Sequence, residues 1–169
     1  MSKRVIILGC VKTKQRGKWP AKDLYTSPLF VGRRRFVEAG CDRWFILSAL
    51  HGLLDPHQVI EPYEQCLVAS GAAERRGWAE RVLRSVDDVL GNVAGATFEI
   101  HAGATYRDFG LVDGLHRRGA EVVVPAAGLS QGQQLAFYAR RCDRSAERAA
   151  PAASQSKSRS GRTASTIGD

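Results

Sequence analysis

The sequence predicts an α/β fold in which a four-stranded parallel sheet carries helices on both faces. Short apolar runs rich in β-branched residues recur along the chain, and helical patterns separate them. Strands that alternate with helices form βαβ units, whose crossovers cover both faces of the sheet. We therefore expect a three-layer α/β/α sandwich in a single domain over residues 1–143, followed by a disordered basic tail over 144–169.

The first half of the chain contains two predicted strands and one capped helix. Arg4–Gly9 is a continuous apolar run ended by glycine, which is typical of a strand buried on both faces. After a basic loop, Ser27 and Pro28 predict a helix start, because serine caps helix N-termini and proline is favoured at the first helical position. This helix should stop at Gly40. Arg43–Ser48 is the second predicted strand.

The second half continues the alternation and ends in a segment of different composition. Apolar residues at helical spacing over 72–90, followed by Gly91, predict an amphipathic helix. Beyond Asp143 almost nothing large and apolar occurs, so burial cannot offset the ordering entropy and the tail should be disordered. The other expected elements are a strand over Thr97–His101, a turn at 102–107 into a helix reaching Arg118, a strand over Glu121–Val124, and a final helix from Gln133 to about Cys142.

The charge of the chain points to an anionic partner. The net charge is +8 and the pI is about 9.7. Residues 1–35 carry ten lysines and arginines against the single acid Asp23. Nucleic acid or a nucleotide is the partner that such a distribution favours, although a merely solvated basic surface is the competing interpretation. The sequence leaves the oligomeric state open.

Two further observations restrict the class of protein. No apolar run approaches the roughly 20 residues of a membrane helix, so we expect a cytoplasmic protein without membrane contact. The four cysteines are isolated, with no C-x-x-C pair and no histidine at zinc-ligand spacing. The sequence therefore predicts neither disulfides nor a metal, and it suggests no other cofactor.

The loops that follow the four predicted strands should meet at one edge of the sheet, where open α/β sheets bind ligands. The densest of these loops follows the second strand and contains a hydroxyl, an imidazole, several acids and a phenol. The candidates are catalytic His51, Glu61, Asp55 and Cys10; phosphate-binding or nucleic-acid-binding Lys12, Lys14, Arg33, Arg34, Arg107, Gly128 and Gly132; base-stacking Tyr25, Tyr63 and Tyr106; and supporting Ser48 and His101.

Each of these residues has a functional and a purely structural interpretation. His51 could carry a proton or stabilise developing negative charge, or it could cap a turn. Glu61 and Asp55 could activate water. Cys10, beside two lysines, could be a nucleophile or a buried inert thiol. Ser48 lacks a nucleophile elbow, so hydrogen bonding is its expected role.

Several short segments form a distinctive combination of motifs: Cys10–Lys14, Leu24–Leu29, Ile46–Leu54, Glu61–Tyr63, Gly103 with Tyr106 and Arg107, and Gly128–Gln133. This combination resembles a family of small bacterial and phage proteins of unknown function, itself distantly similar to the peroxide-stress protein YaaA. More remotely, the spacings Cys10-x-x-x-Lys14 and Ser48-x-x-His51 resemble a domain of archaeosine synthase that is related in fold to uracil-DNA glycosylases.

The resemblance implies a uracil-DNA glycosylase-like sandwich and three alternative functions, with a role in stress or defence. The first is a nucleobase-directed enzyme, most concretely an N-glycosylase, in which Glu61 or Asp55 positions water and His51 stabilises the departing base. The second is a non-catalytic DNA-binding module of YaaA type. The third is amidotransfer to a deazapurine through Cys10.

Overall fold

Four parallel strands occur where the sequence predicts them. In the computed structural model, which describes residues 3–41 and 43–149, they lie side by side in the order β3-β1-β6-β7. All three neighbouring pairs are parallel. Their bounds are β1 (Arg4–Gly9), β3 (Trp44–Ser48), β6 (Thr97–His101) and β7 (Glu121–Val123).

The expectation of a purely parallel, four-stranded sheet is wrong. A fifth strand, β4 (Gly52–Leu54), pairs antiparallel with β3, so the sheet is mixed and has the order β4-β3-β1-β6-β7. Gly52 has a φ of +72°, a left-handed conformation that glycine adopts without steric cost, and the chain reverses there. A separate two-stranded antiparallel ribbon joins β2 (Trp19–Pro20) to β5 (Val59–Ile60).

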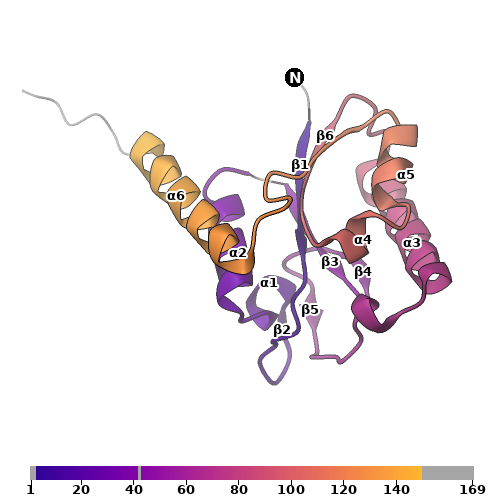
Figure 1. Cartoon of the computed structure of the whole chain (residues 1–169), viewed down its shortest axis with the longest axis horizontal. Coiled ribbons are helices and arrows are strands. Elements are labelled where there is room, and N and C mark those ends of the chain that lie inside the picture. The colour runs from indigo at the N-terminus through magenta and orange to yellow at the C-terminus, as the bar shows by residue number, and fades with distance from the viewer. Residues whose placement is uncertain (1–2, 42, 150–169) are drawn as a thin grey trace, which may run out of the picture.

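Helices cover both faces of the sheet, as predicted. On one face α2 (Pro28–Glu38) packs against α6 (Gln131–Ala149), and on the other α3 (Ala72–Leu90) packs against α5 (Leu111–Arg117) (Figure 1). The short elements are α1 (Ala21–Leu24), α4 (Ala104–Arg107) and a 3-10 turn over Leu67–Ala69.

Local sequence signals explain where most helices begin and end. Ser27 Oγ accepts a hydrogen bond from the Phe30 amide at 3.2 Å and Pro28 is the first residue of α2, which confirms the predicted cap. Gly91 ends α3 as expected. The expected turn at 102–107 contains the short helix α4, and α5 lies within the stretch expected to be helical up to Arg118. Gly110, with a φ of +110°, separates the two helices.

The final helix is longer than the sequence pattern predicts. The expected helix ended near Cys142, whereas α6 continues to Ala149. Residues 144–149, assigned to a disordered tail, are therefore helical, because a run rich in alanine and arginine favours helix even without apolar periodicity. The rest of the expected tail, residues 150–169, lies outside the described residues.

The two cores lie on opposite faces of the sheet because side chains alternate along each strand. Along β1, Val5 and Ile7 join the core beneath α3 and α5, whereas Ile6 and Leu8 join the core beneath α2 and α6. The burial of every residue from Val5 to Gly9 explains why the strand reads as a continuous apolar run. This arrangement leaves the two ends of the sheet available for a site.

Candidate active site at the carboxyl edge of the sheet

The carboxyl ends of β1 and β6 meet at the point where the order of the strands reverses. From β1 the chain crosses to β3 on one side and later returns to β6 and β7 on the other. Ligands of open α/β sheets bind at such a switch point, because the loops diverge and leave a crevice. The loops after β1 and β6 therefore define the centre of the candidate site.

Gly9 allows these two loops to approach closely. A Cβ atom added at Gly9 would lie 2.8 Å from the Cβ of Ala102, and real Cβ atoms do not tolerate so short a contact. The absence of a side chain at the end of β1 thus brings Cys10 next to the chain that follows β6. This is a position where glycine is required for packing rather than for backbone conformation.

A cavity of about 460 Å³ opens at the switch point, and we call it the Cys10 cavity. It brings together residues from the loop after β1, from the segment before α3, and from α4. Two thiols, two ammonium groups, a carboxylate and a phenol thus line the same space. The lining residues are Cys10, Val11, Lys12, Lys14, Glu64, Gln65, Cys66, Val68 and Tyr106.

Cys10 and Tyr106 form the contact that closes this cavity between the two loops. Cys10 Sγ lies 3.2 Å from Tyr106 Oη, within hydrogen-bonding distance for sulfur. The Tyr106 ring packs edge-on against Trp78 at 5.4 Å, and Trp78 Nε1 donates to the Ser48 carbonyl at 2.9 Å. Burial, and then the nearby Cys10, raise the pKa of Tyr106 far above its ordinary value. The phenol therefore stays protonated at neutral pH and can serve as a hydrogen-bond donor.

A chain of hydroxyl groups lies beside the cavity. Ser48 Oγ donates to Tyr63 Oη at 2.7 Å and accepts the His51 amide at 3.0 Å. Tyr63 Oη in turn lies 2.7 Å from Tyr25 Oη. Burial raises the pKa of both tyrosines, which keeps these phenols neutral. Ser48 is fully buried and holds the turn after β3, as a supporting residue would.

The rings of Tyr25 and Tyr63 are both engaged by neighbouring side chains. Tyr25 is only 1% exposed, and its ring packs against Phe30 at 4.9 Å. The Lys14 ammonium lies 4.2 Å from the centroid of the Tyr63 ring, a cation–π contact that fixes the lysine at the cavity wall. Of the three predicted base-stacking tyrosines, Tyr106 is the one that lines the Cys10 cavity.

Three predicted catalytic residues lie apart from this cavity. After Ser48 the chain turns, and β4 runs back along β3, which carries Asp55 away from the carboxyl edge. Asp55 accepts the His57 amide at 2.8 Å, and exposed Glu61 pairs with Lys18 at 3.1 Å. His51 is exposed, and its ring meets Tyr63 edge-on at 5.4 Å. Partial burial of the imidazole nevertheless lowers the pKa of His51, so this side chain is neutral at physiological pH.

A second cavity, of about 210 Å³, lies at the carboxyl ends of β6 and β7. Arg33 and Arg107 contribute its cations, and His101 lies on its wall. Gly128, in a left-handed conformation with φ of +74°, belongs to the loop that closes it. Tyr106 and Arg107 are consecutive residues of α4, so this short helix separates the second cavity from the Cys10 cavity.

A buried polar chain lies at the second cavity and was only partly predicted. His101 Nδ1 lies 2.7 Å from Tyr138 Oη, and its Nε2 lies 2.8 Å from Glu99 Oε1. Burial tends to raise the pKa of Glu99, but hydrogen bonds from His101 and Arg4 outweigh it and lower the value to about 2. The ionised carboxylate can only accept, so Nε2–H donates to it. Burial lowers the pKa of His101, so the imidazole is neutral and its Nδ1 accepts a hydrogen bond from the Tyr138 hydroxyl.

The remaining phosphate-binding candidates differ in their surroundings. Arg34 is committed to carboxylates, because it pairs with both Asp23 and Glu38. Gly132 lies exposed in the first turn of α6 and does not line the second cavity. Glu64, Gln65, Cys66 and Gln134 also line the two cavities. No motif surrounds them, so the sequence pattern does not identify them as site residues.

Two properties of the described residues bear on metals and membranes. Among the side chains that the structure describes, those of residues 3–41 and 43–142, no three from histidine, cysteine, aspartate or glutamate cluster as a metal site would require. None of the helices described here is long and apolar enough to cross a membrane.

The structure is a doubly wound α/β protein with two polar cavities at the carboxyl edge of its sheet. Residues 5–140 match DUF6884, a family of unknown function, and the chain belongs to this family. The chain is also similar to the uncharacterized protein YfjM of Bacillus subtilis (strain 168). The two are 28% identical over 101 residues, which cover 52% of this chain and 67% of YfjM.

Proposed function

We propose that the protein is an enzyme that acts on a nucleobase carried by a nucleotide or nucleic acid, with the Cys10 cavity as its active site. The observation that carries this proposal is that Cys10, Lys12, Lys14, Glu64 and Tyr106 line one cavity at the switch point of the sheet. Ammonium groups suit phosphates, and a phenol can contact a base. The proposed fold relationship to uracil-DNA glycosylases agrees with this assignment.

N-glycosidic cleavage is the most concrete reaction for this site. The carboxylate that lines the cavity is Glu64, which can take the role first expected of Glu61 or Asp55. Glu64 accepts a proton from water as the water oxygen bonds to the sugar carbon. The bond from that carbon to the base breaks, and the base leaves with the bonding electron pair. The protonated Tyr106 hydroxyl is placed to donate a hydrogen bond to the departing base.

Release of a free base from nucleotides or from modified and unmodified DNA, followed by mass spectrometry, tests this reaction. Glu64→Gln should lower the rate about 100-fold or more, the scale of a lost general base. Glu61→Gln decides between the two carboxylates, and Glu74→Gln, exposed in the first turn of α3, is the matched control. Equal rates for Glu64→Gln and Glu74→Gln would remove Glu64 from the mechanism.

A second candidate reaction uses Cys10 as a nucleophile. The observation that favours it is the position of the thiol inside the cavity, 3.2 Å from Tyr106 Oη. The sulfur would bond to the carbon of a deazapurine nitrile while the thiol proton moves to the nitrile nitrogen, giving a thioimidate. An amine would then displace the thiol and form an amidine, as the proposed likeness to archaeosine synthase suggests.

Mass spectrometry of the protein incubated with a nitrile deazapurine tests this second reaction. A thioimidate adds the full mass of the nitrile to the chain, and Cys10→Ser should abolish it. Cys66→Ser is the matched control, because Cys66 lines the same cavity and is exposed. No adduct on the wild-type protein, or an adduct that survives Cys10→Ser, would contradict a nucleophilic Cys10.

The alternative of a non-catalytic DNA-binding module of YaaA type receives less support from the charges. Several basic residues of the N-terminal segment are paired with carboxylates within the protein, which lowers their attraction for phosphate. These pairs are Arg4 with Glu99, Lys18 with Glu61, Lys22 with Glu38, and Arg34 with Asp23 and Glu38.

A further inference from the structure

Arg33 is a buried cation that lacks a counter-charge. Arg33 lies on α2, and this residue is only 7% exposed. One terminal nitrogen donates to Gln134 Oε1 at 2.9 Å, and the other lies 3.5 Å from the Gly9 carbonyl. Its Nε is buried without a hydrogen-bond partner, and no carboxylate among residues 3–41 and 43–142, whose side chains the structure describes, forms an ion pair with it. Burying a charge in this way is costly unless something neutralises it.

The one buried carboxylate among the described residues is committed elsewhere. Glu99 pairs with Arg4 and with His101, and Arg141 Nη1 lies 3.7 Å from its Oε1. His101 and Tyr138, which form a hydrogen-bonded chain with Glu99, are both neutral and supply no negative charge. The positive charge of Arg33 is therefore not balanced from within this part of the protein.

The second cavity is the space that this charge faces. Arg33 lines it together with Arg107, whose Nε donates to the Ala102 carbonyl at 3.0 Å. Asp108 Oδ1 lies 3.7 Å from Arg107 Nη1, and the Asp108 side chain is 57% exposed, so it screens Arg107 only weakly. The cavity volume of about 210 Å³ corresponds to roughly seven water molecules at about 30 Å³ each. A space of this size accommodates one small anion such as phosphate.

The N-terminus of α6 adds to the same positive field. The loop residues Gly128 and Leu129 line the cavity, and Gln134, in the first turn of this 19-residue helix, also lines it. A helix N-terminus carries partial positive charge and attracts anions. Gln134 also holds Arg33, so the helix end and the guanidinium are joined by a direct hydrogen bond.

We propose that the second cavity binds a single phosphate group, with the guanidinium of Arg33 as its central counter-charge and Arg107 as the second cation. A phosphate dianion balances both guanidinium groups, and its oxygens match their donor geometry. This goes beyond the function proposed for the Cys10 cavity and does not depend on the reaction there.

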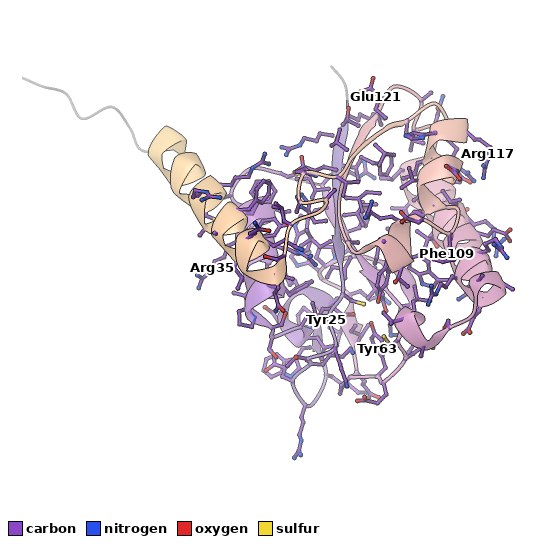
Figure 2. The ribbon with its side chains drawn as sticks, viewed as in Figure 1. Tyr25, Arg35, Tyr63, Phe109, Arg117 and Glu121 are labelled. Atoms are coloured by element: carbon purple, nitrogen blue, oxygen red, sulfur yellow. The ribbon has the colours of Figure 1, made fainter. Side chains whose placement is uncertain are left out.

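Calorimetric titration of the full chain with inorganic phosphate, at constant ionic strength kept with sodium chloride, tests the proposal. We expect saturable binding at one site, tighter than that of acetate. Arg33→Gln should weaken it at least about tenfold, since a hydrogen bond to a charged group is lost. Arg35→Gln is the matched control and should bind within twofold of wild type. Arg35 is exposed on the same helix and points away from the sheet (Figure 2).

A second variant keeps the proposal falsifiable if Arg33→Gln does not fold. Arg107→Gln removes the other cation and should also weaken phosphate binding, with little effect on acetate. No saturable phosphate binding by the wild type, acetate binding of equal affinity, or identical affinities for the Arg33 and Arg35 variants would overturn the phosphate site. Because this titration needs no turnover, its failure is distinct from failure of the base-release assay.

Discussion

Cys10 and Tyr106, 96 positions apart in the sequence, meet with 3.2 Å between sulfur and hydroxyl oxygen. The contact exists because β1 and β6 are adjacent parallel strands and Gly9 lets the chain after one approach the chain after the other. The candidate active site therefore depends on a packing relationship in the sheet as much as on the reactive side chains themselves.

Gly9→Ala should destabilise the protein by about 1–3 kcal/mol, the usual cost of overpacking. The new Cβ would lie 2.8 Å from Ala102 Cβ, so the carboxyl ends of β1 and β6 must separate. Urea unfolding measures the change. Gly40→Ala is the control, because nothing lies within 4 Å of its position, and it should change the free energy of unfolding by less than about 0.5 kcal/mol. Equal stabilities for the two variants would refute the close approach.

Tyr63→Phe should cost about 1–3 kcal/mol of stability. The hydroxyl that it removes joins Ser48 to Tyr25, and both partners are buried, so they would lose hydrogen bonds without gaining water. Chemical denaturation measures this loss. Ser85→Ala, which removes an exposed hydroxyl bonded to the Arg81 carbonyl, should be nearly neutral. A neutral Tyr63→Phe would mean that the hydroxyl chain contributes nothing to stability.

Acidification should destabilise the fold through Glu99. Its pKa falls from 4.5 to about 2 in the folded protein, so the stabilisation is complete above pH 4.5 and is lost as the pH falls toward 2. Its side chain is 7% exposed, and the loss is at most about 3 kcal/mol. The lowered pKa of His101 also reduces stability as the pH falls, starting from about pH 6.5. The reason is that the imidazole binds a proton more readily in the unfolded state than in the folded state.

Thermal unfolding measured from pH 7 to pH 2 checks this dependence. Glu99→Gln should flatten the profile, since an amide does not titrate. Glu121→Gln is the control: Glu121 is exposed on β7 and lies at the surface of the molecule (Figure 2), so its variant should keep the wild-type slope. A wild-type slope in the Glu99 variant would show that other groups control acid unfolding.

Two glycines near the second cavity should respond to alanine in opposite directions. Gly128 has a φ of +74°, so Gly128→Ala should destabilise the protein by about 1–2 kcal/mol. Gly132 lies in α6 with nothing within 4 Å, so Gly132→Ala should stabilise it by about 0.5–1 kcal/mol. Unfolding midpoints of the two variants provide the measurement, and shifts of the same sign would contradict the backbone assigned to this loop.

The sequence predicts the four parallel strands from short runs rich in apolar and β-branched residues. In β1 and β3 burial on both faces explains why these runs are continuous. It does not reveal β4, since three residues beside a tight turn carry no periodic signal, and only pairing with β3 defines them as a strand. The convergence of Cys10, Lys12, Lys14 and Tyr106 follows from the parallel sheet and could be predicted.

The positions of Asp55 and Glu61 could not be predicted, because they depend on that unpredicted strand. The reversal at Gly52 sends the chain back along β3, and Glu61 then meets Lys18. The uncompensated charge of Arg33 was also hidden, since neighbouring Arg34 and Arg35 look equivalent in the sequence. Burial and partners distinguish the three, and these are set by the docking of α6 on α2.

The short helix α4 forms a shared wall of both cavities. Tyr106 faces one cavity and Arg107 the other, and the wall is only four residues long between Gly103 and Asp108. A ligand that displaces α4 from either side must change the shape of both compartments. Thermodynamic linkage then requires reciprocity. If phosphate in the second cavity changes the affinity of the Cys10 cavity for its ligand by some factor, that ligand changes the affinity for phosphate by the same factor.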